Sequence, residues 1–378
     1  MLLSPVKAFI FADQFAYRML KPSFIPIFLV LWLTAWACHQ RPSGQTSAVR
    51  DSVPVAVTHP IQPPSPDSLQ PKPDTTIYPT PATSDTAHPK PADANHAKDS
   101  ASAAKTRVWP VKFPPLLPGS IFPEHRVVAF YGNLYSKNMG ILGELPPDQM
   151  IPKLLQYARM WQEADTTKKV IPALHLIVVT AQGYPGKDGK HRLRMPNWMI
   201  DSVLHMADRI HGLVFLDVQV GLSTLQDEVP RLEPYLKLPN VHLAIDPEFS
   251  MKTGAVPGTR IGTFDAADVN YCVDYLSRLV QEYQLPPKIL VVHRFTQRML
   301  TNYKAIKLRP EVQIVMDMDG WGPKWLKINS YRNFIAREPV EFTGFKLFFK
   351  NDTRNGQPIM TPQEVLSLFP PPVYIQYQ

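Results

Sequence analysis

The sequence predicts a single closed (β/α)₈ barrel, and three observations support this fold class. From Arg126 onward, nearly continuous apolar runs alternate with amphipathic stretches, which is the pattern of parallel strands connected by helices. Eight such units follow one another, and eight units in about 250 residues are the usual size of a closed barrel. No Gly-x-Gly-x-x-Gly opens the first helix, so a doubly wound open sheet is the less favoured alternative.

Each unit is expected to begin with its strand and to continue into its helix. The expected strands cover residues 126–133, 170–181, 213–221, 242–249, 288–295, 312–320, 341–350 and 373–378. The expected helices cover residues 148–163, 197–211, 225–236, 266–283, 297–307, 323–335 and 361–368. Local start signals support three of them, namely Pro146-Pro147-Asp148, Asp265 before Ala266, and Thr361-Pro362 with Glu364. The eighth helix is expected to be missing or replaced by residues 108–122.

Residues 1–38 have the pattern of an export signal. Arg18 and Lys21 precede an apolar stretch at 24–37, which at about 14 residues is short for a membrane-spanning helix and normal for a signal-peptide core. The stretch ends in Ala35-Trp36-Ala37-Cys38, which resembles a bacterial lipobox, and this resemblance implies that Cys38 carries lipid. Ala-x-Ala also suits ordinary signal peptidase, which would release a soluble protein, and an uncleaved signal anchor is a third alternative. The expected location is the bacterial cell envelope, with a lipid anchor in its membrane.

Residues 39–107 predict a disordered tether between this signal and the folded domain at 108–378. The segment is rich in Pro, Ser, Thr, Ala, Asp and Lys, and Tyr78 is its only aromatic residue. Proline pairs such as Pro63-Pro64 favour extended polyproline II structure. Such a composition buries too little apolar surface to offset the entropy of ordering the chain.

Charge and cysteine content exclude several classes of function. The net charge is +8, but the Lys and Arg residues are scattered, without a basic run or interleaved aromatic residues, so we expect no nucleic-acid partner. The two cysteines, Cys38 and Cys272, exclude a disulfide scaffold and a cysteine-based zinc site. Cys272 is expected to be a buried thiol.

Polar residues at the ends of the predicted strands indicate a functional site. Sites of (β/α)₈ barrels form at the carboxyl ends of the strands, where alternate side chains point into the barrel. Acidic side chains that interrupt apolar strands cost free energy unless they are paired or solvated. The residues expected at this mouth are Tyr131, Asp217, Gln219, Asp246, Glu248, His293, Asp317, Asp319, Trp321 and Lys346, with His175 and Gln376 added by strands two and eight. Taken singly, His175 and His293 are more typical of core histidines, and Lys346 of a partner to one carboxylate.

The segment Asp246-Pro-Glu248 resembles the strand-end Asp-x-Glu of chitinase-type and lysozyme-type barrel glycosidases. This resemblance implies that Glu248 donates the proton and that Asp246 raises the pKa of Glu248 or orients its proton. We expect Asp317 to belong to the catalytic group as well, with Asp317 or Asp217 helping to hold the substrate. The remaining predicted site residues would then bind the glycan or another small polar substrate, with the aromatic rings of Tyr131 and Trp321 stacking on sugar faces. No cofactor and no metal belongs to this interpretation. The full chitinase run of four spaced acids is missing.

A second resemblance, to uncharacterised secreted bacterial barrel lipoproteins, rests on Leu-Asp217-Val-Gln219, Ala-Ile-Asp246-Pro-Glu248 and His293-Arg-Phe. It spans most of residues 126–378 and implies a real site without naming a substrate. Two other functions stay open. Carboxylates with an imidazole suit a divalent cation, so a metal-dependent hydrolase or phosphodiesterase is one alternative. A surface domain that binds glycans without turnover is the other.

Overall fold

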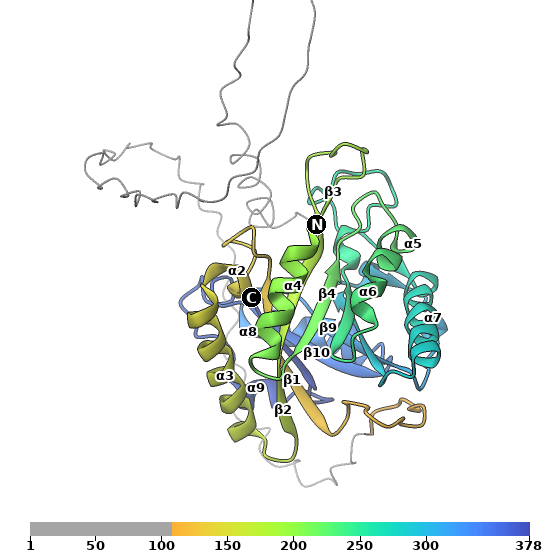
Figure 1. Cartoon of the computed structure of the whole chain (residues 1–378). Coiled ribbons are helices and arrows are strands. Elements are labelled where there is room, and N and C mark those ends of the chain that lie inside the picture. The colour runs from red at the N-terminus through yellow and green to blue at the C-terminus, as the bar shows by residue number, and fades with distance from the viewer. Residues whose placement is uncertain (1–107) are drawn as a thin grey trace, which may run out of the picture. The chain divides into compact units, whose positions relative to one another are not determined.

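Eight parallel strands close on themselves in residues 108–378, the part of the chain that this computed structural model describes (Figure 1). The order around the barrel is β1-β2-β4-β5-β7-β9-β10-β11, and β1 pairs with both β2 and β11. The predicted (β/α)₈ fold class is therefore confirmed, and the open-sheet alternative is wrong. The predicted signal at 1–38, the lipidation of Cys38 and the tether at 39–107 lie outside the described residues.

The barrel strands follow the predicted apolar runs closely. They are β1 His125–Gly132, β2 Lys169–Ala181, β4 Leu213–Val218, β5 Val241–Ile245, β7 Lys288–Arg294, β9 Val312–Met318, β10 Phe342–Leu347 and β11 Tyr374–Tyr377. Short strands lie outside the barrel: β3 Arg192–Arg194 pairs antiparallel with the end of β2, and β6 Phe264–Asp265 pairs with β8 Leu300–Thr301.

Helices of very different length lie between the strands and cover the outside of the barrel (Figure 1). The longer ones are α3 Pro147–Ala164, α4 Asn197–Asp208, α7 Ala266–Tyr283 and α8 Lys324–Ser330, which continues as the π-helix Tyr331–Ala336. The short ones are α2 Ile141–Glu144, α5 Leu225–Glu228, α6 Glu233–Leu236 and α9 Pro362–Leu366, with 3₁₀ turns at Val229–Leu232, Pro247–Phe249, Gln297–Met299 and Tyr303–Ala305. None of these helices in residues 108–378 combines the length and the apolar character that crossing a membrane requires.

The predicted helix at 297–307 is wrong. This segment forms two 3₁₀ turns separated by strand β8, and Asn302 between them has the left-handed φ of 55°. The cause lies outside the segment, in the buried side chain of Arg294 at the end of β7. Its guanidinium donates to the carbonyls of Gln297 at 3.0 Å and Thr296 at 3.3 Å. These bonds hold the loop in a shape that an α-helix does not have.

The strand predicted at 242–249 ends earlier, at Ile245. Pro247 has no N–H to continue the ladder, and the carboxylate of Asp246 accepts the N–H of Glu248 at 2.9 Å. Asp246 therefore caps a 3₁₀ turn instead of continuing the strand. This turn, and not strand pleating, places Glu248 beside Asp246.

Side chains alternate along each strand between two apolar layers. One set packs between the barrel and its helices, for example Leu243 and Val292. The other set fills the interior of the barrel and includes Phe215, Ala244 and Val291. The interior positions at the carboxyl ends of the strands are polar, as the period-two pattern predicts.

The amino-terminal end of the barrel is closed by residues 108–122, which contain no helix and do not replace the eighth one. The ring of Phe122 packs 5.2 Å from that of Phe342, and the amide of Gln313 bonds the backbone of Ile121 and Phe122. Further along, the indole of Trp109 donates to the carbonyl of Glu341. This end of the barrel is called the floor below.

Candidate active site at the barrel mouth

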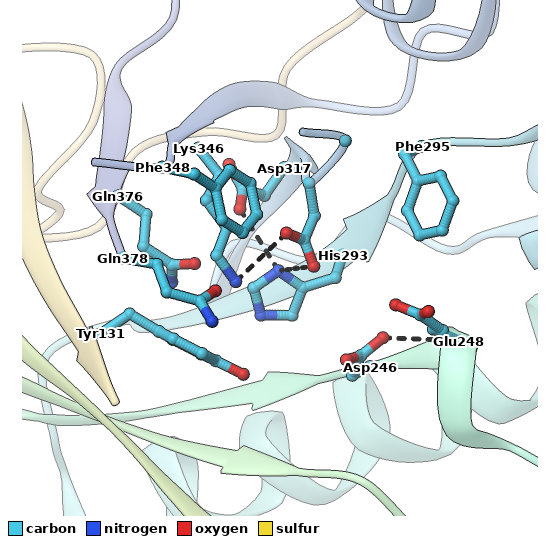
Figure 2. A network of polar contacts seen from close by, with 12 residues as sticks. Tyr131, Asp246, Glu248, His293, Phe295, Asp317, Lys346, Phe348, Gln376 and Gln378 are labelled. Carbon is cyan, nitrogen blue, oxygen red and sulfur yellow. Dashed lines mark hydrogen bonds and ion pairs between the residues drawn. The ribbon is translucent and has the colours of Figure 1, made fainter. Parts of the chain in front are cut away.

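The carboxyl ends of the barrel strands bring most of the predicted site residues together. They lie on the interior face, at the end opposite the floor, which is called the mouth below (Figure 2). Strands β1, β4, β7, β9 and β10 supply interior-facing members of the set, and the turn after β5 supplies two carboxylates. The predicted residues found together are Tyr131, Asp217, Gln219, Asp246, Glu248, His293, Asp317, Asp319 and Lys346.

The deepest part of the mouth is built around Asp217 on β4. Its Oδ2 atom lies 3.5 Å from Nε2 of His293 and 3.6 Å from Nε2 of His175, and all three side chains are fully buried. The hydroxyl of Tyr131 donates to the same oxygen at 3.1 Å. Histidines on β2 and β7 and a tyrosine on β1 thus converge on one carboxylate.

Two aspartates contact the opposite nitrogen of the His293 ring: Asp317 on β9 and Asp319, which follows the end of β9. The Nδ1 atom of the ring lies 3.2 Å from Asp317 (Figure 2). The same atom lies 3.6 Å from Asp319. Gly344 on the neighbouring strand makes room for Asp317, since a Cβ at this glycine would lie 2.5 Å from the Asp317 carboxylate. Lys346 lies 3.1 Å from Asp319, which joins β10 to the network.

A small cavity opens above this network. Its volume is about 70 Å³, which is room for a few water molecules. Asp246, Glu248 and Asp319 line it together, and carboxylate oxygens of the three lie within 4.8 Å of one another. Gln219 orients Asp246 by donating to it at 3.4 Å, while its own oxygen accepts the N–H of Ala181.

Burial and neighbouring charges shift the pKa values of these groups in different directions. Burial, followed by the charges of Glu248 and Asp319, raises the pKa of Asp246 to about 8 against the opposing charge of His293. Burial alone would lower the pKa of His293, but the charge of Asp217 raises that pKa well above its ordinary value. At neutral pH, Asp246 is therefore a protonated carboxyl and His293 a cation.

His175 shows the opposite behaviour. Burial lowers its pKa to about 4, so its ring is neutral at physiological pH. Its Nδ1 atom lies 2.6 Å from the hydroxyl of Tyr374 and 2.8 Å from the amide of Gln376. The sequence pattern is typical of a core histidine here, and the structure places the ring inside the polar network.

The two aromatic residues predicted to stack on sugar have different surroundings in the structure. Trp321 lies past the end of β9, where the guanidinium of Arg354 covers its ring at 5.7 Å, and it is not among the residues that line the cavity. Tyr131 does line the cavity, but the ammonium of Lys346 lies 3.6 Å from its ring centroid. That face is occupied by a cation and is not open to a sugar.

Tyr374 and Gln378 are site residues that sequence reasoning missed. Tyr374 bonds His175, and Gln378 lines the cavity while donating to the carbonyl of Met139. The available signal is period two in the last strand, where Tyr374, Gln376 and Gln378 alternate with apolar residues.

No known protein family matches this chain, and no curated protein is detectably similar to it in sequence. The class of protein is therefore defined by the structure itself. It is a (β/α)₈ barrel whose mouth holds five carboxyl groups and three basic side chains. Two sets of these side chains have donor atoms close enough to hold a metal ion: His175, Asp217 and His293, and Asp246, Glu248 and Asp319.

Proposed function

We propose that the mouth hydrolyses a glycosidic bond by acid–base catalysis. The observation that supports this function is the group of three carboxyl side chains on the wall of one cavity, with oxygens within 4.8 Å of one another. Glycosidases need one carboxyl that gives a proton to the leaving oxygen and a second that attacks the sugar or activates water. A close pair, about 5 Å apart, is typical of enzymes that retain the anomeric configuration.

The three carboxyl groups differ in their surroundings, and the differences suggest their roles. Asp246 holds a proton at neutral pH, because burial raises its pKa to about 8. Its Oδ1 atom accepts the backbone N–H of Glu248, whose side chain lines the same cavity. Glu248 is assigned as the acid that gives its own carboxyl proton to the leaving oxygen as the glycosidic bond breaks. The ammonium of Lys346, 3.1 Å from Asp319, favours the ionised form that a nucleophile or base requires.

Exposed aromatic side chains near the mouth suit a glycan that extends beyond the small cavity. Tyr135 follows β1 and Trp198 lies in the first turn of α4, and their rings meet edge to face at 5.7 Å. Both are more than half exposed. Loop 133–140, which carries Tyr135, also supplies Met139 to the cavity wall. Aromatic faces of this kind stack on sugar rings.

The test is turnover by the full chain and by Glu248→Gln on a panel of bacterial and host glycans. The variant keeps the shape of the side chain but has no acidic proton, so we expect turnover to fall by roughly 10²–10⁴ while glycan binding persists. Glu341→Gln is the matched control, because it changes a buried glutamate at the floor of the same barrel.

Three results would contradict this function. Near-full activity of Glu248→Gln would remove its assigned role. Activity that disappears with a chelator and returns with a metal would favour the metal-dependent hydrolase. Glycan binding by the wild type with no turnover on any member of the panel would favour the non-catalytic surface domain.

We also propose that the chain works in the bacterial cell envelope, held by a lipid on Cys38. The support is the Ala35-Trp36-Ala37-Cys38 pattern after an apolar stretch of signal-peptide length. Cys38→Ala is expected to move the protein from the membrane fraction to soluble or uncleaved forms. A variant that stays in the membrane with its signal removed would exclude lipidation at this position.

A further inference from the structure

The distances around Asp217 do not fit ordinary hydrogen bonds. Nε2 atoms of His293 and His175 lie 3.5 and 3.6 Å from Asp217 Oδ2, whereas N–H···O bonds are usually 2.7–3.2 Å long. Zinc holds imidazole nitrogens and carboxylate oxygens at 2.0–2.2 Å in a tetrahedron. Neighbouring ligand atoms of such a tetrahedron lie about 3.3–3.6 Å apart. The observed separations are thus close to the edges of a metal coordination shell.

Unsatisfied polar atoms point to the same place. Nε2 of His175, Nε2 of His293 and Oδ1 of Asp217 are buried and make no hydrogen bond within the described residues, although all three side chains have no exposed surface. Buried polar atoms nearly always have partners, so unpartnered atoms on three adjoining side chains require an explanation. One cation between the two Nε2 atoms and the Asp217 carboxylate would give both imidazole nitrogens a partner.

The opposite nitrogens of both rings face polar groups. Nδ1 of His175 lies 2.6 Å from the hydroxyl of Tyr374 and 2.8 Å from the amide of Gln376. Nδ1 of His293 lies 3.2 Å from Asp317, although it makes no hydrogen bond within the described residues. Histidines that bind metals typically contact a carboxylate or another polar group through the second nitrogen, which fixes the ring orientation. Both rings therefore present Nε2 toward Asp217.

Charge balance at the mouth also favours a bound cation. Five carboxyl groups gather there with the two imidazoles, and the ammonium of Lys346 contacts one of these carboxyl groups, Asp319. Excess buried negative charge is costly unless a further cation compensates it.

We propose that His175, Asp217 and His293 form a binding site for one divalent transition-metal ion of the zinc type. Two imidazoles and one carboxylate leave a fourth position, and Tyr131 lies beside it, with its hydroxyl 3.1 Å from Asp217. Tyr131 also lines the cavity, so its ring lies between the metal site and the solvent-accessible space. The site is separate from the Glu248 cavity wall, and its existence does not depend on the proposed glycan hydrolysis.

The experiment is a metal titration of the full chain, purified without a polyhistidine tag and stripped with a chelator. We expect one equivalent of Zn²⁺ or Co²⁺ to bind tightly, with the intense visible absorption of tetrahedral Co²⁺. His175→Gln and Asp217→Asn should each weaken this binding by more than about 100-fold, which exceeds the usual 10–100-fold cost of losing an outer partner. His39, His59, His88 and His96 are unchanged in these variants, so any binding by them cancels in the comparison.

Controls separate the metal site from a folding defect. His242→Gln changes another buried barrel histidine, which accepts the N–H of Ile289 at the floor, and it should bind metal as the wild type does. Tyr374→Phe removes one of the two groups at Nδ1 of His175 and leaves the other, Gln376, in place. It should weaken binding by about 10-fold or more, even where His175→Gln fails to fold.

The proposal is overturned if the wild type takes up no tight equivalent, or if Asp217→Asn and Tyr374→Phe bind metal as well as the wild type. A proton on His293 then fills the place of the metal. These outcomes leave the Glu248→Gln test untouched, because the titration uses no glycan.

Discussion

The two ends of the barrel bury similar polar side chains and use them in opposite ways. At the floor, several polar groups bond the backbone, while Nε2 of His242 makes no hydrogen bond within the described residues. Lys288 donates to the carbonyls of Leu238 and Val241, and Glu341 accepts the N–H of Ile314. At the mouth, side chains contact one another, and neither oxygen of Asp317 makes a hydrogen bond within residues 108–378. The comparison teaches that polar side chains bonded to the backbone stabilise the fold, while a cluster of polar side chains with many unpartnered atoms marks the place where a ligand is expected.

The largest expected effect comes from replacing a lysine by methionine at each end of the barrel, Lys288 at the floor and Lys346 at the mouth. Lys288→Met should lower the free energy of unfolding by about 2–4 kcal/mol, because two buried carbonyls lose their donor, and it should leave turnover intact. Lys346→Met should cost less stability, because Asp319 borders the cavity and can take up water or a proton. Its turnover should fall by at least about tenfold, since Asp319 loses the charge that favours its ionised form.

Urea unfolding at pH 7 and the glycan assay measure both quantities for both variants. If both variants lose the same free energy of unfolding and Lys346→Met keeps its activity, the lysine at the mouth has the same structural role as the lysine at the floor.

A smaller expected effect is the pH dependence of the free energy of unfolding that Glu341 causes at the floor. Burial raises the pKa of Glu341 to about 8, so the folded protein keeps a proton there that the unfolded chain releases above about pH 4.5. The contribution of the protonated Glu341 carboxyl to the free energy of unfolding is fully present below pH 4.5. This contribution is lost as the pH rises toward 8. From pH 6 to pH 8, wild type should lose about 2 kcal/mol more than Glu341→Gln, which resembles the protonated form at every pH.

Asp246 and Lys288 also have a pKa of about 8, and their contributions have opposite signs. Burial raises the pKa of Asp246, so its stability is lost as pH rises. Burial lowers the pKa of Lys288, so its stability is lost as pH falls from about 10.5 to 8. Both groups are present in wild type and in Glu341→Gln, so the difference between the two unfolding curves isolates Glu341. Parallel curves would show that the carboxyl is ionised in the folded state.

The barrel and most of its mouth could be predicted from the sequence, because both depend on short-range regularities. Apolar runs define the strands, and period two places Asp217, His293 and Asp317 on the inner face once the strands are known. The role of His175 could not be predicted this way. A histidine inside an apolar strand has the same pattern whether it packs in the core or faces Asp217, and the difference depends on Tyr131, Tyr374 and β7.

The errors also arise from contacts between residues distant in sequence. Residues 297–307 have an acceptable helical pattern, and Arg294 overrides it by binding carbonyls there and at Phe334. Trp321 follows the acidic end of β9 in sequence, but Arg354 from a later loop covers its ring. Neither partner is indicated by local spacing.

The pairing of β1 with β11 has a consequence for the order of events when the chain folds. It joins Val127 to Tyr374, two residues at opposite ends of the described chain. Contacts between such distant residues are slow to form, because the loop they close is long. This pairing brings β1, which carries Tyr131, beside β11, which carries Gln376, and so completes the ring of strands around the mouth. A partly folded barrel can therefore have its helices and most of its sheet without a complete mouth, and regained activity reports the last seam to close.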